Sequence, residues 1–250
     1  MIFSRHVQLS LIIIVITLLN STFSQEVNQL TKELSSRLDF SPLWTKTPNT
    51  LVFGFIGDNF QRLRMKIISA TKDSEHPDRY RVCGKSKVKN NICRFSGTIT
   101  IQSIDTLTEM HWGVDDNYKD SGIVKEGSLT AHYYFTEDST QLHSGIFEGT
   151  LSTSWYIDSH GQLRYDNIEI YSDSYCNNQF EGTWKPRNAN KAKICNWGDY
   201  RILSSRDLDI GAGEFSPDEK YLKYGWQSYQ DAWLNENDNA RHEEEKEWWK

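Results

Sequence analysis

The sequence predicts a single all-β domain, either an antiparallel meandering β-barrel or a curved β-sandwich, with a short N-terminal helix and a short C-terminal helix. From Thr50 onward, apolar and polar residues alternate along most of the chain, which is typical of strands with one face in a core. Turn signals divide this pattern into about nine or ten short strands. The chain of 250 residues has only 15 Gly and 5 Pro, which excludes collagen-like and low-complexity classes.

The first residues have the features of a secretory signal. Arg5 precedes an apolar run over 9–19, which is too short for an ordinary transmembrane helix but long enough for the apolar core of a signal. Small residues, ending in Ser24, precede the expected cut. We therefore expect residues 1–24 to be removed and the mature chain to be secreted, periplasmic or extracellular, and not integral to the membrane. An uncleaved membrane anchor is the alternative.

After the signal, leucines and a valine recur at helical spacing, which predicts a short amphipathic helix over about 26–38 within a lead-in of residues 25–49. The β-domain, with a C-terminal loop and helix, is expected over 50–234. An acidic tail, frayed or helical, is expected over 235–250.

The clearest strands are expected at four places, where the alternation is longest: 93–101, 128–135, 147–157 and 176–184. Weaker strands are expected near Leu51–Ile56, Leu63–Ile68, Tyr80–Cys83, Thr106–Trp112 and Leu163–Tyr171.

Three strands share a Phe-x-Gly-Thr signature, with the glycine at Gly97, Gly149 and Gly182. Phe and Gly two residues apart point to the same side of a strand. A glycine on the inner face then leaves room for an aromatic ring from a neighbouring strand, or lets the strand coil sharply. Either effect favours a sheet that curves or closes.

The C-terminal quarter changes character. The segment Ser216-Pro217-Asp218-Glu219 combines an N-cap serine, a proline at the first helical position and a glutamate three residues after the cap. This capping box predicts the start of a short helix.

The four cysteines are predicted to form disulfides in an exported chain, because thiols pair in an oxidising compartment. They lack the C-x-x-C spacing of zinc and thioredoxin-like centres. Three connectivities are possible for four cysteines. Closeness in sequence favours Cys83 with Cys93, across a hairpin, and Cys176 with Cys195, across a second connection.

The aromatic content of 13%, with 9 Trp, 12 Tyr and 11 Phe, is the strongest hint of a ligand site. Trp155 and Trp184 share the predicted inner face with Asn178, as apolar walls and a polar anchor do in ligand cavities. A filled core is the equal alternative. Trp112 and Trp197 lie near predicted turns, where their rings either stack on sugars or plug the ends of a barrel.

The acidic loop near residue 210 is a weak candidate for calcium, with Asp207, Asp209 and Glu214 as oxygen ligands between flexible glycines. Compared with a helix-loop-helix calcium loop, Gly211 brings no ligand and Ala212 replaces the required glycine. A solvated turn is the favoured interpretation. No cofactor other than this calcium is expected.

Two glutamates, Glu148 and Glu181, occupy the same place in two Phe-Glu-Gly-Thr strands and are weak candidates for the acid and base of a glycoside hydrolase. Both lie on the face opposite the Phe and Gly side chains, so in a barrel they are expected to point to solvent. The sequence contains no G-x-S-x-G motif of serine hydrolases, no H-E-x-x-H motif of zinc proteases and no G-x-G-x-x-G motif of dinucleotide-binding enzymes that opens a helix.

These observations favour an exported, non-enzymatic protein that binds a small apolar molecule in a barrel or a saccharide on an aromatic face. A secreted carbohydrate-active hydrolase and a structural or surface-associated interaction protein are the alternatives. The formal charge of −6 argues against nucleic acid as a partner. The identity of the ligand and the oligomeric state do not follow from the sequence.

Overall fold

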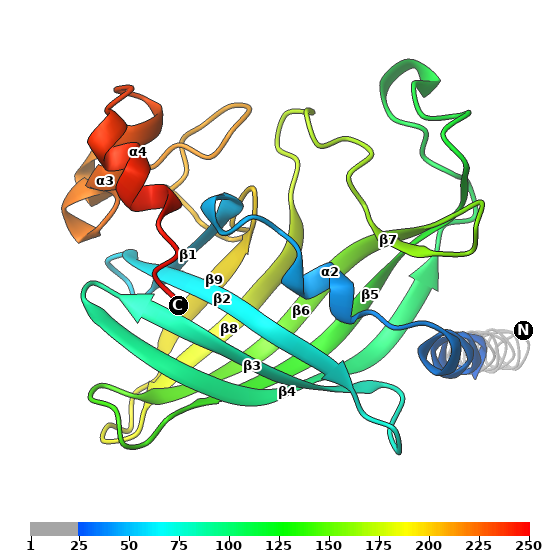
Figure 1. Ribbon diagram of the computed structural model, residues 1–250, viewed down its shortest axis with the longest axis horizontal. Helices are drawn as coiled ribbons and strands as arrows, with labels where there is room; N and C mark the ends of the chain where they lie inside the picture. Colours follow the sequence, from blue (N-terminus) through cyan, green and yellow to red (C-terminus); the bar gives the residue numbers. More distant parts are fainter. Residues whose placement is uncertain (1–24) are drawn as a thin grey trace, which may run out of the picture.

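The computed structural model describes residues 25–250, so the signal predicted for residues 1–24 lies outside the described residues. The described residues form nine antiparallel strands (Figure 1). In chain order these are β1 (Val52–Ile56), β2 (Gln61–Lys72), β3 (Arg79–Val88), β4 (Asn91–Thr106), β5 (Ile123–Glu137), β6 (Gly145–Asp158), β7 (Leu163–Tyr165), β8 (Asn177–Pro186) and β9 (Lys193–Asp199).

Eight strands close into a barrel in the order β5-β4-β3-β2-β1-β9-β8-β6, and pairing of β5 with β6 completes the ring. Each strand pairs with the next along the chain, except that β6 pairs directly with β8 while the short β7 lies outside the ring. β9 returns to pair with every residue of β1, from Val52 with Asp199 to Ile56 with Cys195. The all-β prediction is confirmed, and of the two predicted architectures the meandering barrel is the observed one.

Most strands lie where alternation predicts them, but the weak strand expected near Thr106–Trp112 is wrong. β4 ends at Thr106, and residues 107–122 form a connection that contains the 3-10 turn η2 (Val114–Asp116). The strand expected over Leu163–Tyr171 is reduced to the three residues of β7.

The inner-face glycines make room for aromatic rings, as their pattern predicts. Gly149 and Gly182 are register partners on β6 and β8. A Cβ at these two positions would lie 2.8 and 2.6 Å from the hydroxyl oxygen of Tyr133. On β5, a Cβ at Gly127 would lie 2.5 Å from the ring of Trp155. Because a side chain has no space there, these strands need glycine in order to enclose large rings.

Aromatic side chains fill the middle of the barrel. Phe180 and Trp197 stack with their ring centroids 4.5 Å apart, and Tyr133 packs edge-on against both. Phe135 and Phe147 complete the group, and all five side chains are buried. At this level the interior is a packed core, which was one of the two interpretations that the sequence left open.

The N-terminal segment closes one end of the barrel. Residues 25–37 are helical, as the sequence predicts, and α2 (Ser41–Thr45) follows. Phe40 and Trp44 enter the core, where Phe40 packs against Trp155 and the indole nitrogen of Trp44 donates to Thr153 at 3.1 Å. Figure 1 shows α2 lying across this end of the strands.

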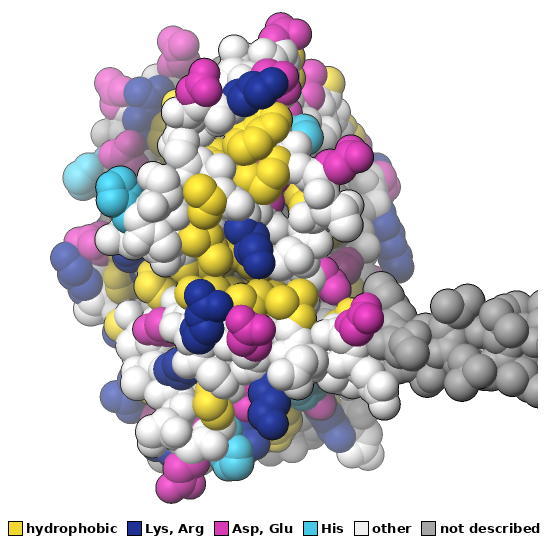
Figure 2. Space-filling model, turned by 90° about the vertical axis from the view of Figure 1, so that its right-hand side faces the viewer, with side chains coloured by type: hydrophobic (Ala, Val, Ile, Leu, Met, Phe, Trp, Pro, Cys, Tyr) yellow, Lys and Arg dark blue, Asp and Glu magenta, His cyan; other side chains and the backbone are white. Residues whose placement is uncertain are grey.

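Figure 2 views the right-hand side of Figure 1. Hydrophobic side chains form a band that runs upward from the middle of this face. The helices of the described residues are too short and too polar to cross a lipid bilayer.

The C-terminal segment covers the outer face of β1. Besides the short turn η1 (Asn49–Leu51) before β1, its elements are η3 (Glu219–Tyr224), α3 (Gln227–Trp233) and α4 (Asp238–Glu245). Phe53 and Phe55 point outward from β1 into a second hydrophobic cluster with Phe215 and Trp226. The predicted helix start is displaced by a few residues, because Asp218 caps η3 by accepting from the backbone amide of Lys220.

The predicted disulfides are wrong, because all four cysteines are free thiols. Cys83 is paired in register with Ser96 rather than with Cys93. Its side chain is exposed, whereas that of Cys93 is buried. Cys195 is buried within β9, several residues along the sheet from Cys176, which precedes β8. Closeness in sequence did not bring either pair face to face, because hairpin register decides which residues meet.

Candidate functional site

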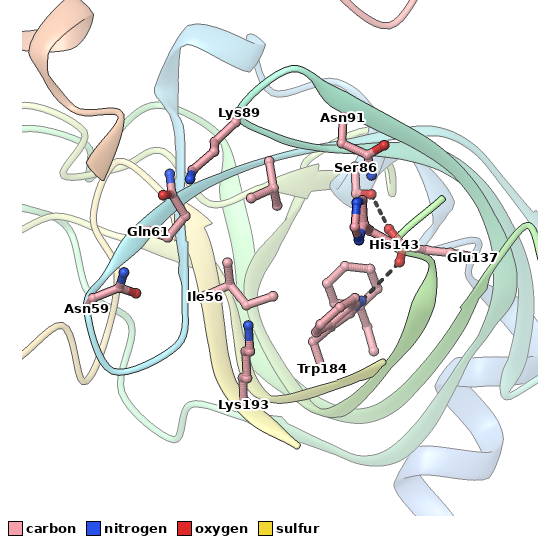
Figure 3. A pocket seen from close by; sticks show the side chains of 12 residues that line it. Ile56, Asn59, Gln61, Ser86, Lys89, Asn91, Glu137, His143, Trp184 and Lys193 are labelled. Atoms are coloured by element: carbon pink, nitrogen blue, oxygen red, sulfur yellow. Dashed lines mark hydrogen bonds between the residues drawn. The ribbon is translucent and has the colours of Figure 1, made fainter. Parts of the chain in front are cut away.

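The end of the barrel opposite α2 is an open mouth with a cavity of about 410 Å³ (Figure 3). It lies among the four connections β1–β2, β3–β4, β5–β6 and β8–β9. Its lining consists of Ile56, Asn59, Gln61, Ser86, Val88, Lys89, Asn91, Glu137, His143, Phe147, Trp184 and Lys193. We call this cavity the mouth pocket.

Trp184 forms a fixed aromatic platform on one side of the mouth pocket. Its indole nitrogen donates to a carboxylate oxygen of Glu137 at 2.9 Å. Its ring lies over Gly145, where a Cβ would approach to 2.5 Å, and packs against Phe147. The ammonium of Lys193 lies 5.7 Å from the ring centroid. Held at both its edge and its face, the ring is pre-oriented toward the cavity.

Glu137 is the buried acid of the mouth pocket, with only 3% of its surface exposed. Its carboxylate accepts from the Ser86 hydroxyl, from the Gly145 amide at 2.7 Å and from Trp184. Burial raises the pKa of Glu137, and these hydrogen bonds oppose that rise. Sequence reasoning missed this residue. The signal was present, because residue 137 continues the inward-facing odd positions of β5 and is the acid among apolar ones.

The rim of the mouth pocket is polar and carries positive charge. Lys89 and His143 stand on turns and both adopt left-handed backbone conformations, with φ of 54° and 57°. Lys89 and Lys193 bring ammonium groups to the rim, and Asn59 and Asn91 bring amide groups. The floor, by contrast, is formed by aromatic and aliphatic side chains. The arrangement therefore suits a molecule with one apolar part and one polar or anionic part.

Of the predicted binding residues, only Trp184 lies in the mouth pocket. Trp155 and Trp197 are buried in the core, with 0% and 2% of their surfaces exposed. Trp112 is half-buried in the β4–β5 connection. The sequence correctly placed Trp155 and Trp184 on inner faces, but it could not tell the packed middle of a strand from its open end.

Asn178 belongs to a buried polar network at the plugged end. Asp199, which sequence reasoning missed, accepts hydrogen bonds from Thr47 at 2.8 Å, Asn178 at 2.7 Å and Tyr165 at 3.0 Å. Burial raises the pKa of Asp199 to about 7, against the hydrogen bonds and the charge of Lys66, which lower it. The network joins the segment after α2 to β7, β8 and β9.

The two candidate catalytic glutamates lie on the outer wall of the barrel. Glu148 is exposed and pairs with His132 at 3.3 Å. Glu181 is exposed and accepts from Ser204 at 2.6 Å. Neither lines the mouth pocket.

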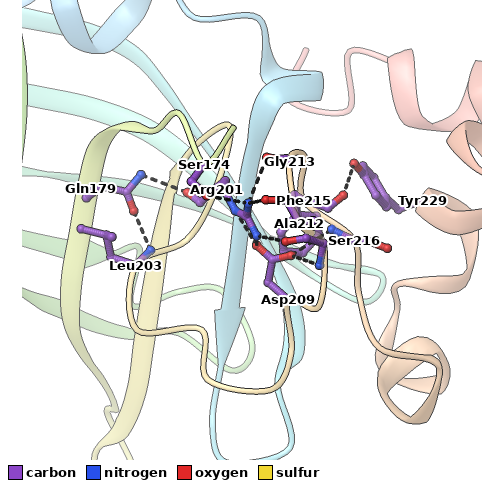
Figure 4. Close-up of polar contacts among 11 residues, drawn as sticks. Ser174, Gln179, Arg201, Leu203, Asp209, Ala212, Gly213, Phe215, Ser216 and Tyr229 are labelled. Atoms are coloured by element: carbon purple, nitrogen blue, oxygen red, sulfur yellow. Dashed lines mark hydrogen bonds and ion pairs between the residues drawn. The ribbon is translucent and has the colours of Figure 1, made fainter. Parts of the chain in front are cut away.

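A guanidinium group occupies the centre of the acidic loop (Figure 4). Arg201 donates to the Asp209 carboxylate at 2.8 Å and to the backbone carbonyls of Gly211 at 2.6 Å and Gly213 at 2.9 Å. Asp207 turns away and pairs with Lys220. These are the kinds of oxygen that calcium would use, so the arginine takes the position that the calcium hypothesis assigned to the ion.

Glu214, the third proposed calcium ligand, is exposed. Within residues 25–250, no group of three or more His, Cys, Asp or Glu side chains is arranged to hold a metal ion. The loop is thus built around Arg201.

A second cavity, of about 390 Å³, lies between the outer face of β1 and the loops that follow β7 and β9. We call it the tyrosine groove. Tyr175 and Tyr200 pack edge to face on its wall with centroids 4.9 Å apart, and Tyr171 is 94% exposed beside them. Phe53 and Phe215 form the inner part of the lining.

Comparison with protein-family models, with curated proteins and with solved structures finds no match to this chain.

Proposed function

We propose that this protein is a non-enzymatic binding protein whose mouth pocket holds a small molecule with a flat apolar part and a polar or anionic substituent. The observation that carries the proposal is the indole of Trp184, which is fixed by Glu137 and faces the cavity. A ring that is ordered before binding loses little conformational entropy when a ligand packs on it.

The dimensions of the barrel limit the ligand. A volume of about 410 Å³ falls in the lower part of the range for small-molecule sites. The aromatic core below the mouth leaves the deeper part of the barrel filled. A molecule of one or two rings therefore suits this pocket better than a long acyl chain.

The charges of the rim suggest the second part of the ligand. Lys89 and Lys193 stand at the edge of the cavity, while the acid of Glu137 is already engaged by three donors. An anionic substituent, such as a carboxylate, would thus meet ammonium groups while its ring packs on Trp184.

The experiment is a titration of tryptophan fluorescence with aromatic and alicyclic carboxylates, fatty acids and neutral oligosaccharides. Trp184→Leu is expected to weaken binding of the ring-bearing carboxylates at least tenfold. Trp233→Leu removes a partly exposed tryptophan from α3, outside the barrel, and is expected to leave affinity unchanged. The proposal is overturned if no compound of this panel binds saturably, or if both variants lose affinity equally.

The tyrosine groove supports a second candidate function, which is the binding of a saccharide on exposed aromatic rings. The specific observation is Tyr171, whose ring is almost wholly exposed beside Tyr175 and Tyr200. Binding of a neutral oligosaccharide that survives Trp184→Leu but is lost in Tyr171→Ala would favour this candidate. Release of reducing sugar that is lost in Glu148→Gln or Glu181→Gln would instead favour the hydrolase.

A further inference from the structure

The outer faces of β2 and β3 carry a concentration of cationic side chains. Inward-facing Leu63, Met65 and Ile67 are buried in the core, so the residues between them point outward. We call the outward set the basic wall: Arg62, Arg64 and Lys66 on β2, Lys85 and Lys87 on β3, and Lys89 in the turn after β3. This wall belongs to a chain with a formal charge of −6.

Register places like charges directly opposite one another. Arg64 is the cross-strand partner of Lys87, and Lys66 is the partner of Lys85. Such pairs are destabilising in antiparallel sheets, because their Cβ atoms lie only about 5 Å apart. The crowding is also felt by Lys87, whose pKa is lowered first by burial and next by the charge of Arg64. Like-charge pairs of this kind add no stability to the sheet, and a local rule broken in this way is characteristic of a functional surface.

Carboxylates compensate only part of the basic wall. Glu244 of α4 accepts from Arg62 and from Arg64, at 2.6 Å each. Lys66 faces the ring of Trp249 at 5.3 Å. Among residues 25–250, the remaining members Lys85, Lys87 and Lys89 form no ion pair. Three ammonium groups are therefore free to meet an anion.

Two of the free ammonium groups border a recess. A cavity of about 300 Å³ lies between the β2–β3 wall and the C-terminal segment, and Lys87 and Lys89 contribute to its lining. Glu243 also lines it, and its carboxylate pairs with Lys246 at 3.7 Å. An oxyanion in this recess would meet the ammonium groups of Lys87 and Lys89, because the Arg64 guanidinium is already bound by Glu244, and ammonium groups are donors that bind sulfate and phosphate groups.

We infer that the basic wall binds a sulfated polysaccharide. Lys85 and Lys87 alternate on the outer face of β3, with Cα atoms about 7 Å apart, and Lys89 follows them in the turn, so the three residues form a row of cationic side chains. A linear polymer with repeating anionic groups matches such a row, whereas a single small anion fills only the recess. The outward positions of β2 and β3 named above are all Arg or Lys, and the Trp249 ring is already covered by Lys66, so a run of stacking rings like that used by single-stranded nucleic acid is not part of this wall.

The test measures binding of a heparin-derived octasaccharide to the full chain at several salt concentrations. Lys85→Gln/Lys87→Gln is the informative variant, because Lys89 also lines the mouth pocket and is left intact. We expect its affinity for the octasaccharide to fall at least tenfold. The slope of log Kd against log salt should become shallower by about two, roughly one for each lysine removed. Its melting temperature should be equal to or above that of the parent chain, since repulsion is relieved.

A matched control removes the same charge from other parts of the barrel. Lys125 on β5 and Lys185 on β8 are both exposed, and Lys125→Gln/Lys185→Gln is expected to retain octasaccharide affinity within about twofold. Equal losses in the two double variants would overturn the inference. So would equal binding of the desulfated octasaccharide, saturation by inorganic sulfate at the same affinity, or tighter binding of a DNA oligomer or of phosphatidylserine vesicles.

Discussion

The indole nitrogen of Trp184 and the carboxylate of Glu137 are joined by a 2.9 Å hydrogen bond between β8 and β5, two strands that are not neighbours in the barrel. β6 lies between them, so the bond spans the mouth over a third strand. It makes the shape of the mouth pocket depend on one buried acid.

Replacing this acid should loosen the mouth. Glu137→Ala leaves donors from Ser86, Gly145 and Trp184 without their common acceptor, and we expect the free energy of unfolding to fall by about 3 kcal/mol. Glu137→Gln keeps one carbonyl oxygen and should lose less. Urea unfolding measures both. Glu148→Ala, on the outer wall, serves as the control, and an equal loss in that variant would contradict the role of Glu137.

Asp199 should make stability depend on pH. Its pKa is about 7 in the folded chain, against 3.8 for a free aspartate side chain, so the folded state holds a proton that the unfolded state releases. The stabilisation of the folded state by this proton is fully present below pH 3.8. It declines as the pH rises from 3.8 to 7 and is lost above pH 7. The loss amounts to about 4 kcal/mol.

Asp199→Asn should remove this pH dependence, because asparagine stays neutral while its carbonyl oxygen can still accept hydrogen bonds. We expect the variant to gain stability relative to the parent chain between pH 5 and pH 8.5 in urea unfolding. Asp120→Asn, at an exposed position, should follow the parent chain. A variant curve parallel to that of the parent chain would show that Asp199 is already ionised at pH 5.

Glu244 should hold the C-terminal helices on the barrel. It is buried and shared by Arg62 and Arg64, so Glu244→Ala leaves two largely buried cations without their carboxylate. Breaking a buried ion pair in this way costs about 3 to 5 kcal/mol. Limited proteolysis should then cleave first within the C-terminal helices. Glu245→Ala, the exposed neighbour on α4, should resist the protease as the parent chain does.

Calcium should not stabilise the protein through the acidic loop. Arg201 already binds the Asp209 carboxylate and the loop carbonyls, so a divalent cation would have to displace a guanidinium. We expect equal melting temperatures with calcium and with a chelator. Arg201→Gln should lower the melting temperature in both conditions. A rise with calcium in the parent chain would restore the metal hypothesis.

The all-β fold could be predicted from the sequence because its strands obey a local rule. Alternation places Phe147 and Trp155 on the inner face of β6, and the inner-face glycines lie where rings approach. These patterns repeat within each strand and need no knowledge of its neighbours. The choice between barrel and sandwich was left open, because it depends on β9 pairing with β1, which no local pattern records.

The candidate site was less predictable, for a physical reason. Trp155 and Trp184 look alike in sequence, yet one is buried in the packed interior and the other stands at the mouth, because they lie at different heights in the barrel. Glu137 and Asp199 organise their sites only through hydrogen-bond partners that lie far from them in the sequence. The prediction of the disulfides was wrong for the same reason. Hairpin register, and not separation in sequence, decides which side chains meet.

Closure of the ring also sets an order of events for folding. Val52 of β1 meets Asp199 of β9, so one edge of the growing sheet stays open until β9 has been synthesised. Such distant contacts slow folding, and an open edge is a template for pairing with another chain. The outward-facing side chains of Phe53 and Phe55 also stay exposed during this time, because the helices that cover them follow β9 in the chain. Truncations before residue 193 should therefore aggregate rather than form a smaller barrel.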